Sequence, residues 1–221
     1  MNDEATDPAG YRYSSGELNV SHRYLLPAVV DILNKVAGQG DRRIFELGCG
    51  NGSVANTLAD LGFDITGVDP SSQAVHYATS CYPSLKIFQD SAYQDLTARY
   101  GKYSTVLSLE VIEHVYFPRK FASVVYDLLV PGGTAIISTP YHGYLKNVFL
   151  SVSGKMDAHF TALWDHGHIK FWSMRTLQSL LNEAGFDDVS FIRVGRIPLL
   201  AKSMIAIAKK PSADCVERIS P

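Results

Sequence analysis

The stretch that decides the fold runs from Ile44 to Ala55 and reads IFELGCGNGSVA. It opens with apolar, β-prone residues, alternates three glycines in its middle, and continues into a run with helical spacing. Glycine permits a positive φ and lets a ligand approach the main chain, while the start of a helix presents free backbone N–H groups. We therefore predict a strand at 43–47, a ligand-binding turn and a helix at 53–61.

The rest of the chain repeats this alternation of short apolar runs and helical runs. Upstream, apolar residues recur at helical spacing over 21–37, with Ser21 as the predicted N-cap. Downstream, strands are predicted at 64–68, 86–88, 103–109 and 134–139, and helices at 72–80, 118–129 and 173–184. The last two strands, at 189–194 and 203–208, have no helix between them and must pair antiparallel. We expect an α/β fold with a doubly wound, seven-stranded, mostly parallel sheet that ends in a C-terminal antiparallel strand pair.

Length and composition indicate one globular domain. The chain has 221 residues, of which 46% are hydrophobic and 19% charged, with a formal charge of −2 and a pI near 6.4. This balance argues against nucleic acid as a partner, and three scattered cysteines argue against a disulfide framework. Neither a signal peptide nor a membrane-spanning run is recognisable, so we expect a cytoplasmic protein. Flexible segments are expected at 1–20 and 211–221, around a domain at 21–210.

Acidic residues stand at positions suited to a nucleoside ligand. Glu46 precedes the glycine turn, where it can meet a cationic amino acid group; Asp69 ends the second strand, where a carboxylate can accept both ribose hydroxyls. Asp90 follows the third strand and can bind an adenine edge. The run GNGSVA also satisfies the G-x-G-x-x-A pattern of dinucleotide sites, so an NAD-binding oxidoreductase is an alternative. The acidic Glu46, the three alternating glycines and the last strand pair count against it.

Four motifs stand out: ELGCGNG from Glu46, GVD from Gly67, EVIEH from Glu110 and VPGG from Val130. Together they resemble the class I S-adenosylmethionine-dependent methyltransferases, whose fold is Rossmann-like. The run LEVIEHV looks most like the ubiquinone-biosynthesis O-methyltransferases and is also similar to small-RNA 2′-O-methyltransferases. The resemblance implies S-adenosyl-L-methionine as cofactor, in a site lined by Gly48, Gly50, Asp69, Asp90 and Leu109. Beside these residues, the predicted cofactor-binding set includes Glu46, Asn51, Gly52, Pro70 and Ser91.

A second group of residues follows the fourth predicted strand, at the edge where open α/β sheets bind ligands. Glu110, Glu113 and His114 have i, i+3, i+4 spacing, which would place them on one face of a helical turn. The later run DHGHIKFW adds His166 and His168, and the small-RNA enzymes likewise add a later histidine. We predict that His168, His114 and Glu113 are catalytic, either in a proton relay or, with Glu110, as ligands of a divalent cation, Mg²⁺, Mn²⁺ or Zn²⁺. The alternative is that these side chains only serve packing or the cofactor pocket.

The segment 141–172 shows no clean period and is rich in aromatic residues, and we interpret it as a cap inserted over the site. His159 is expected to be exposed on it. The cap's aromatic side chains indicate either a flat, apolar methyl acceptor or a plain secondary core: Tyr141, Tyr144, Phe149, Phe160, Trp164 and Trp172. We predict O-methylation of a small phenol, catechol or quinone precursor, with RNA ribose 2′-O-methylation as an alternative. A monomer, a homodimer and peripheral membrane contact are all compatible with the sequence.

Overall fold

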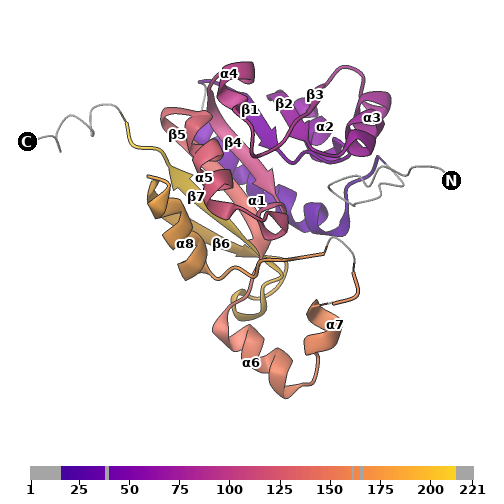
Figure 1. Cartoon of the computed structure of the whole chain (residues 1–221), viewed down its shortest axis with the longest axis vertical. Helices are drawn as coiled ribbons and strands as arrows, with labels where there is room; N and C mark the ends of the chain where they lie inside the picture. The colour runs from indigo at the N-terminus through magenta and orange to yellow at the C-terminus, as the bar shows by residue number, and fades with distance from the viewer. Residues whose placement is uncertain (1–15, 38–39, 161, 165–166, 213–221) are drawn as a thin grey trace, which may run out of the picture.

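The computed structural model describes residues 16–37, 40–160, 162–164 and 167–212, and its centre is one mixed sheet (Figure 1). The strand order is β3-β2-β1-β4-β5-β7-β6. The first five strands pair in parallel, and β7 pairs antiparallel with both β5 and β6. The strands are β1 (Arg43–Leu47), β2 (Asp64–Asp69), β3 (Lys86–Gln89), β4 (Tyr103–Leu109), β5 (Leu129–Pro140), β6 (Asp187–Val194) and β7 (Ser203–Lys209). The predicted doubly wound sheet with its antiparallel C-terminal pair is confirmed.

Helices cover both faces of the sheet and bury two apolar layers. One layer contains α1 (Val20–Ala37), α2 (Ser53–Asp60) and α3 (Ser72–Cys81). The other contains α4 (Leu96–Tyr100), α5 (Pro118–Asp127) and α8 (Met174–Glu183). Successive residues of β4 alternate between the layers, Val106 in the second and Leu107 in the first, as the pleat of a strand requires.

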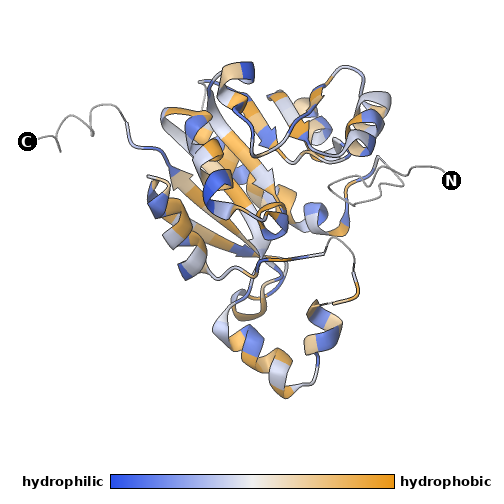
Figure 2. Cartoon of the chain, viewed as in Figure 1, coloured by the Kyte–Doolittle hydropathy of each residue, from blue (hydrophilic) through white to orange (hydrophobic). Residues whose placement is uncertain are grey.

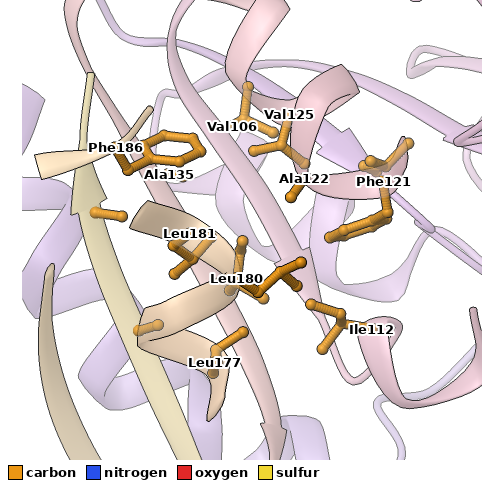
Figure 3. Packing of buried hydrophobic residues seen from close by; sticks show 14 of the residues in the cluster. Val106, Ile112, Phe121, Ala122, Val125, Ala135, Leu177, Leu180, Leu181 and Phe186 are labelled. Atoms are coloured by element: carbon orange, nitrogen blue, oxygen red, sulfur yellow. The ribbon is translucent and has the colours of Figure 1, made fainter. Parts of the chain in front are cut away.

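The layer under α5 and α8 also fixes the start of the candidate site (Figure 3). Ile112 is fully buried in it, in the same cluster as Phe121 of α5 and Leu177 of α8. Ile112 belongs to η1 (Ile112–His114), a single 3₁₀ turn that follows β4. The side chain beside Glu113 is therefore locked in the core, so this turn has a defined position relative to the sheet.

Two local predictions are wrong, and one short helix was not predicted. The N-cap of α1 is Asn19 rather than Ser21, because the Asn19 side chain accepts a hydrogen bond from the His22 backbone at 2.8 Å. Strand β5 begins at Leu129 rather than Thr134, since Leu129 already pairs with Tyr103 and the Pro-Gly-Gly run continues the strand. The short helix α4 was not expected, although Asp95 caps it by accepting from the Ala98 backbone at 3.1 Å.

The segment 141–172 contains α6 (Tyr144–Val152) and α7 (Met156–Phe160), which extend beyond the end of β5 and away from the two helical layers (Figure 1). Neither helix was predicted. A further 3₁₀ turn, η2 (Pro198–Leu200), connects β6 to β7 and packs against α6. Within the described residues, no helix is both long and apolar enough to cross a membrane. The segments 1–15 and 213–221, within the predicted flexible ends, lie outside the described residues.

Candidate active site

The glycine turn after β1 has the conformation that its sequence predicts. Gly48, Gly50 and Gly52 have φ values of 84°, 51° and 75°, a region that side-chain-bearing residues rarely adopt. Space is also restricted, because a Cβ on Gly48 would overlap Val111 Cγ2 and lie 3.2 Å from Cγ1 of the same side chain. The turn therefore packs directly against the residue that follows Glu110.

Asp69 links the glycine turn to the loop after β2. Its carboxylate accepts hydrogen bonds from the backbone N–H groups of Gly50 and Ser71, each at 2.9 Å. Ser71 in turn caps α3 by accepting from the Ala74 backbone at 3.0 Å. Asp69 is buried and ends β2 at the carboxyl edge of the sheet, next to Pro70. Its carboxylate thus shapes the turn at the same edge where it was predicted to meet a ribose.

We expect Asp69→Ala to weaken binding of S-adenosylmethionine by about 1.5 to 3 kcal/mol, the range for hydrogen bonds to charged groups. The loss has two sources, because the carboxylate orders Gly50 and Ser71 and is predicted to accept from the ribose. Titration calorimetry measures it. Asp64→Ala, at the exposed start of the same strand, is the matched control, and equal affinity of the Asp69 variant and the wild type would contradict the prediction.

Asp90 is held by partners that the sequence reasoning did not identify. One carboxylate oxygen accepts from Arg99 Nη1 at 2.6 Å and from the Tyr100 hydroxyl at 3.1 Å, and the other accepts from the Ser91 backbone at 2.8 Å. Both partner side chains come from α4, which was not predicted. Leu109, the last residue of β4, is buried. The capped start of α4 at Asp95 is the signal that could have indicated this helix.

Glu46 is a buried acid of β1 that stands two residues before Gly48 of the glycine turn. Its Oε2 has no hydrogen-bond partner among the described residues, and burial, followed by the charge of Asp69, raises its pKa to about 8. Burial likewise raises the pKa of Cys49, which makes this thiol a poor nucleophile. A buried carboxyl group next to the glycine turn is suited to a ligand that carries a positive charge.

We expect the affinity for S-adenosylmethionine to rise with pH between pH 6 and pH 8. A cationic ligand favours the ionised form of Glu46, whereas the free protein keeps this carboxyl protonated below its pKa of about 8. Binding then releases a proton, and the affinity rises by at most about tenfold per pH unit, since one pKa unit corresponds to about 1.4 kcal/mol. Calorimetry across this range measures the slope. Glu46→Gln should flatten it, and an unchanged slope in that variant would assign the effect to another group.

Glu110 is oriented differently from the helical turn that its spacing predicted. Its φ is 55°, and the following turn is 3₁₀ rather than α-helical. The carboxylate accepts from Ser138 Oγ at 2.8 Å and from Ser203 Oγ at 3.2 Å, and burial raises its pKa to about 7. Ser203 also bonds the Tyr24 hydroxyl at 2.9 Å. Glu110 therefore belongs to a hydrogen-bond network with residues of α1, β5 and β7.

Glu113, His114 and His168 lie together. One ligand atom from each lies within 4.8 Å of the others, and His168 Nε2 is 4.0 Å from Glu113 Oε1. Glu113 is 1% exposed, and neither carboxylate oxygen has a hydrogen-bond partner among the described residues. Burial and the charge of Glu110 raise the pKa of Glu113, while burial and His114 lower that of His168 to about 4. Glu110 lies outside this group, and His166 lies outside the described residues.

Backbone hydrogen bonds bring the end of the segment 141–172 back onto η1. Ile169 and Lys170 donate through their N–H groups to the Glu113 carbonyl at 2.9 and 3.0 Å. The Trp172 indole donates to the Ile112 carbonyl at 3.3 Å. These bonds place His168 beside Glu113, although the two residues are far apart in the sequence.

A second ring cluster includes His159 and Phe160 of α7 and was not predicted from the sequence. The buried His142 packs its ring against His159, Phe160 and Phe171, with centroid distances of 5.4, 5.7 and 5.1 Å. Its Nδ1 is buried and has no hydrogen-bond partner among the described residues. Burial, followed by Lys146, lowers the pKa of His142 to about 4. His159 is half-buried in this cluster rather than exposed as expected.

The other aromatic residues of the segment have different environments. Trp164 packs against His114 and His168, with centroid distances of 6.3 and 5.5 Å. Tyr144 and Phe149 instead are exposed on α6. The aromatic set therefore divides into residues around the histidines, residues that face outward, and Tyr141 and Trp172, which are buried in the core under α5 and α8.

Comparison with known proteins assigns the chain. A family model described as a methyltransferase domain matches residues 21–190. The chain belongs to this family. This methyltransferase is 25% identical over 175 residues to a ubiquinone biosynthesis O-methyltransferase of Psychrobacter arcticus, covering 76% of this chain and 68% of that protein. It is 28% identical over 172 residues to the protein of the same name from Roseobacter denitrificans, covering 72% and 69%.

A solved structure shows the same fold. Magnesium protoporphyrin IX methyltransferase from Synechocystis PCC 6803, with bound S-adenosylhomocysteine, superposes with a TM-score of 0.65 at 19% identity over 95% of each chain. The family match and the strand order make the chain a class I S-adenosylmethionine-dependent methyltransferase. They decide against the NAD-binding alternative.

Proposed function

We propose that this methyltransferase transfers the methyl group to a hydroxyl of a small, flat aromatic acceptor: a phenol, a catechol or a quinone precursor. The observation that carries the proposal is the convergence of Glu113, His114 and His168. A hydroxyl must lose its proton in the course of methyl transfer, and the lowered pKa of His168 keeps its imidazole neutral, so it can accept this proton beside Glu113. The names of the O-methyltransferases similar to this chain support the same class of acceptor.

The cofactor-binding residues remain those predicted: Glu46, Gly48, Gly50, Asn51, Gly52, Asp69, Pro70, Asp90, Ser91 and Leu109. When bound, S-adenosylmethionine supplies an electrophilic methyl group on a positively charged sulfur. The unpartnered Oε2 of Glu46 and the positive φ values of the glycines fit such a ligand. Glu46 would balance its positive charge, and the glycine turn would let it approach the main chain.

The acceptor would lie between the histidine group and the ring cluster of His142, Phe160 and Phe171. Aromatic rings bind flat apolar rings by stacked or edge contacts. The buried Nδ1 of His142 lies beside the side chain of Asn147, and these polar groups would hydrogen-bond a polar substituent of the acceptor. On this proposal the segment 141–172 is the cap that covers the acceptor.

The proposal assigns catalysis to His168, His114 and Glu113, which act either as ligands of a metal ion or as a proton relay. Two imidazoles and a carboxylate are ligands that Zn²⁺ or Mn²⁺ accepts, and a bound ion would lower the pKa of the acceptor hydroxyl. Dialysis against a chelator separates the two cases. Activity that vanishes and returns with Mg²⁺, Mn²⁺ or Zn²⁺ assigns a metal site, whereas unchanged activity assigns a proton relay.

The acceptor class is tested by incubating the enzyme with labelled S-adenosylmethionine and a panel of acceptors. The panel contains catechols, phenols, the corresponding anilines and a short RNA. We expect label on the oxygen of the catechols or phenols, located by mass spectrometry and NMR. Label on nitrogen, or on the ribose of the RNA, would overturn the proposal.

A further inference from the structure

Helix α6 has an apolar face that the fold leaves uncovered. Leu145, Val148, Phe149 and Val152 follow i, i+3, i+4, i+7 spacing, so they lie along one side of the helix. All four are exposed, Leu145 by 54% and Val152 by 85%, and Leu150 is the one buried residue of this helix. An apolar stripe of this kind normally packs against the core of the protein, whereas the stripe of α6 is exposed to solvent.

The neighbouring turn η2 enlarges this surface. Ile197 and Leu199 are also large, exposed apolar residues, and η2 packs against α6. We call the exposed side chains of α6 and η2 the tip surface: Leu145, Val148, Phe149, Val152, Ile197 and Leu199. They lie at the end of the molecule beyond β5, where Figure 2 shows apolar residues along α6.

Positive charge predominates around the tip surface, although Asp157 of α7, a helix that packs against α6, lies just beyond it in the sequence. The segments 140–156 and 189–203, which carry the surface, contain five basic residues and no acidic residue, although the whole chain has a net charge of −2. Of these five, Lys155 and Arg196 are exposed and form no ion pair with a described residue. Positive charge is therefore concentrated beside the exposed apolar residues of the tip surface.

We propose that the tip surface docks onto an anionic lipid bilayer. An amphipathic helix with an apolar stripe and basic neighbours is suited to lie in the interface, with its stripe among the acyl chains and its cations at the headgroups. A second copy of the chain would bring two basic surfaces together, so charge complementarity favours the bilayer over self-association. Helix α6 is part of the proposed cap, so, if the proposed function holds, a docked enzyme has its acceptor pocket close to the membrane.

Flotation with vesicles tests this inference without any measurement of methyl transfer. The full chain is mixed with vesicles of phosphatidylcholine alone or with equal parts of phosphatidylglycerol. We expect binding to the anionic vesicles, weakened by high salt. Leu145→Asp and Val152→Asp should each reduce the fraction bound about tenfold or more, because an apolar side chain in the interface is replaced by an anion. Lys155→Glu with Arg196→Glu should have a similar effect.

Leu61→Asp is the matched control, because Leu61 is an apolar residue with 49% exposure that follows α2, outside the tip surface. Circular dichroism and S-adenosylmethionine binding verify that each variant is folded. Absence of vesicle binding, equal binding to both vesicle types, or an equal loss with Leu61→Asp would overturn the proposal. So would a dimer that the two tip variants dissociate while vesicle binding stays unchanged, since the surface would then be covered by a second copy.

Discussion

His168→Ala should lower the rate of methyl transfer about 10²- to 10⁴-fold, the loss typical of a missing general base, while the affinity for S-adenosylmethionine stays unchanged. The reason is geometric. His168 reaches the site from the segment 141–172, and its Nε2 lies 4.0 Å from Glu113 Oε1, whereas the predicted cofactor residues lie at the carboxyl ends of β1, β2, β3 and β4. Steady-state kinetics with the best acceptor of the panel, together with calorimetry for the cofactor, measure both quantities.

Two comparisons make this prediction specific. His76→Ala removes an exposed histidine of α3 and should leave the rate unchanged. Glu113→Gln should resemble His168→Ala, and the double variant should lose little more than either single one, since residues that act as a unit have non-additive effects. A double variant whose loss is the product of the two single losses would show that Glu113 and His168 act independently.

The sequence predicted the sheet because its signals are local. The run from Ile44 to Ala55 combines a β-prone stretch, glycines that need positive φ and a helical run, and the structure contains β1, the turn and α2 there. Helix α6 also has a local signal, the stripe from Leu145 to Val152, yet it was missed because the surrounding aromatic residues and glycines obscured its period. The stripe is also exposed in the structure, whereas apolar residues with this spacing are usually buried.

The site was predictable only where topology alone decides. Glu113 and His114 follow β4, at the carboxyl edge of a parallel sheet, and this placement follows from the strand order. The orientation of Glu110 depends on a positive φ and on Ser203, which belongs to a strand that pairs beside β5. Likewise the burial of His142 depends on rings from several segments. Such contacts between distant segments leave no periodic trace in the sequence.

Gly48→Ala should destabilise the protein by about 2 to 5 kcal/mol and reduce cofactor affinity. A residue with a Cβ at a φ of 84° costs about 1 to 2 kcal/mol, and forcing extra atoms into a packed core adds about 1 to 3 kcal/mol. The overlap falls on Val111, which stands between Glu110 and Ile112. Because Ile112 is fixed in the core, Val111 has little freedom to move. Urea unfolding measures the stability, and calorimetry measures the cofactor affinity.

Gly62→Ala separates the two contributions, because Gly62 has a φ of 83° but no atom within 4 Å of an added Cβ. This control carries the same backbone strain in open space, so it should cost only about 1 to 2 kcal/mol and leave the cofactor affinity unchanged. The difference between the variants is then the cost of the overlap with Val111.

If that contact joins the cofactor turn to η1, Gly48→Ala should also lower the rate of methyl transfer at saturating cofactor, because Val111 cannot shift without moving the turn that carries Glu113. Equal losses of stability in the two alanine variants would show that Val111 moves aside without cost. A wild-type rate of methyl transfer at saturating cofactor would show that this contact does not couple the cofactor turn to η1.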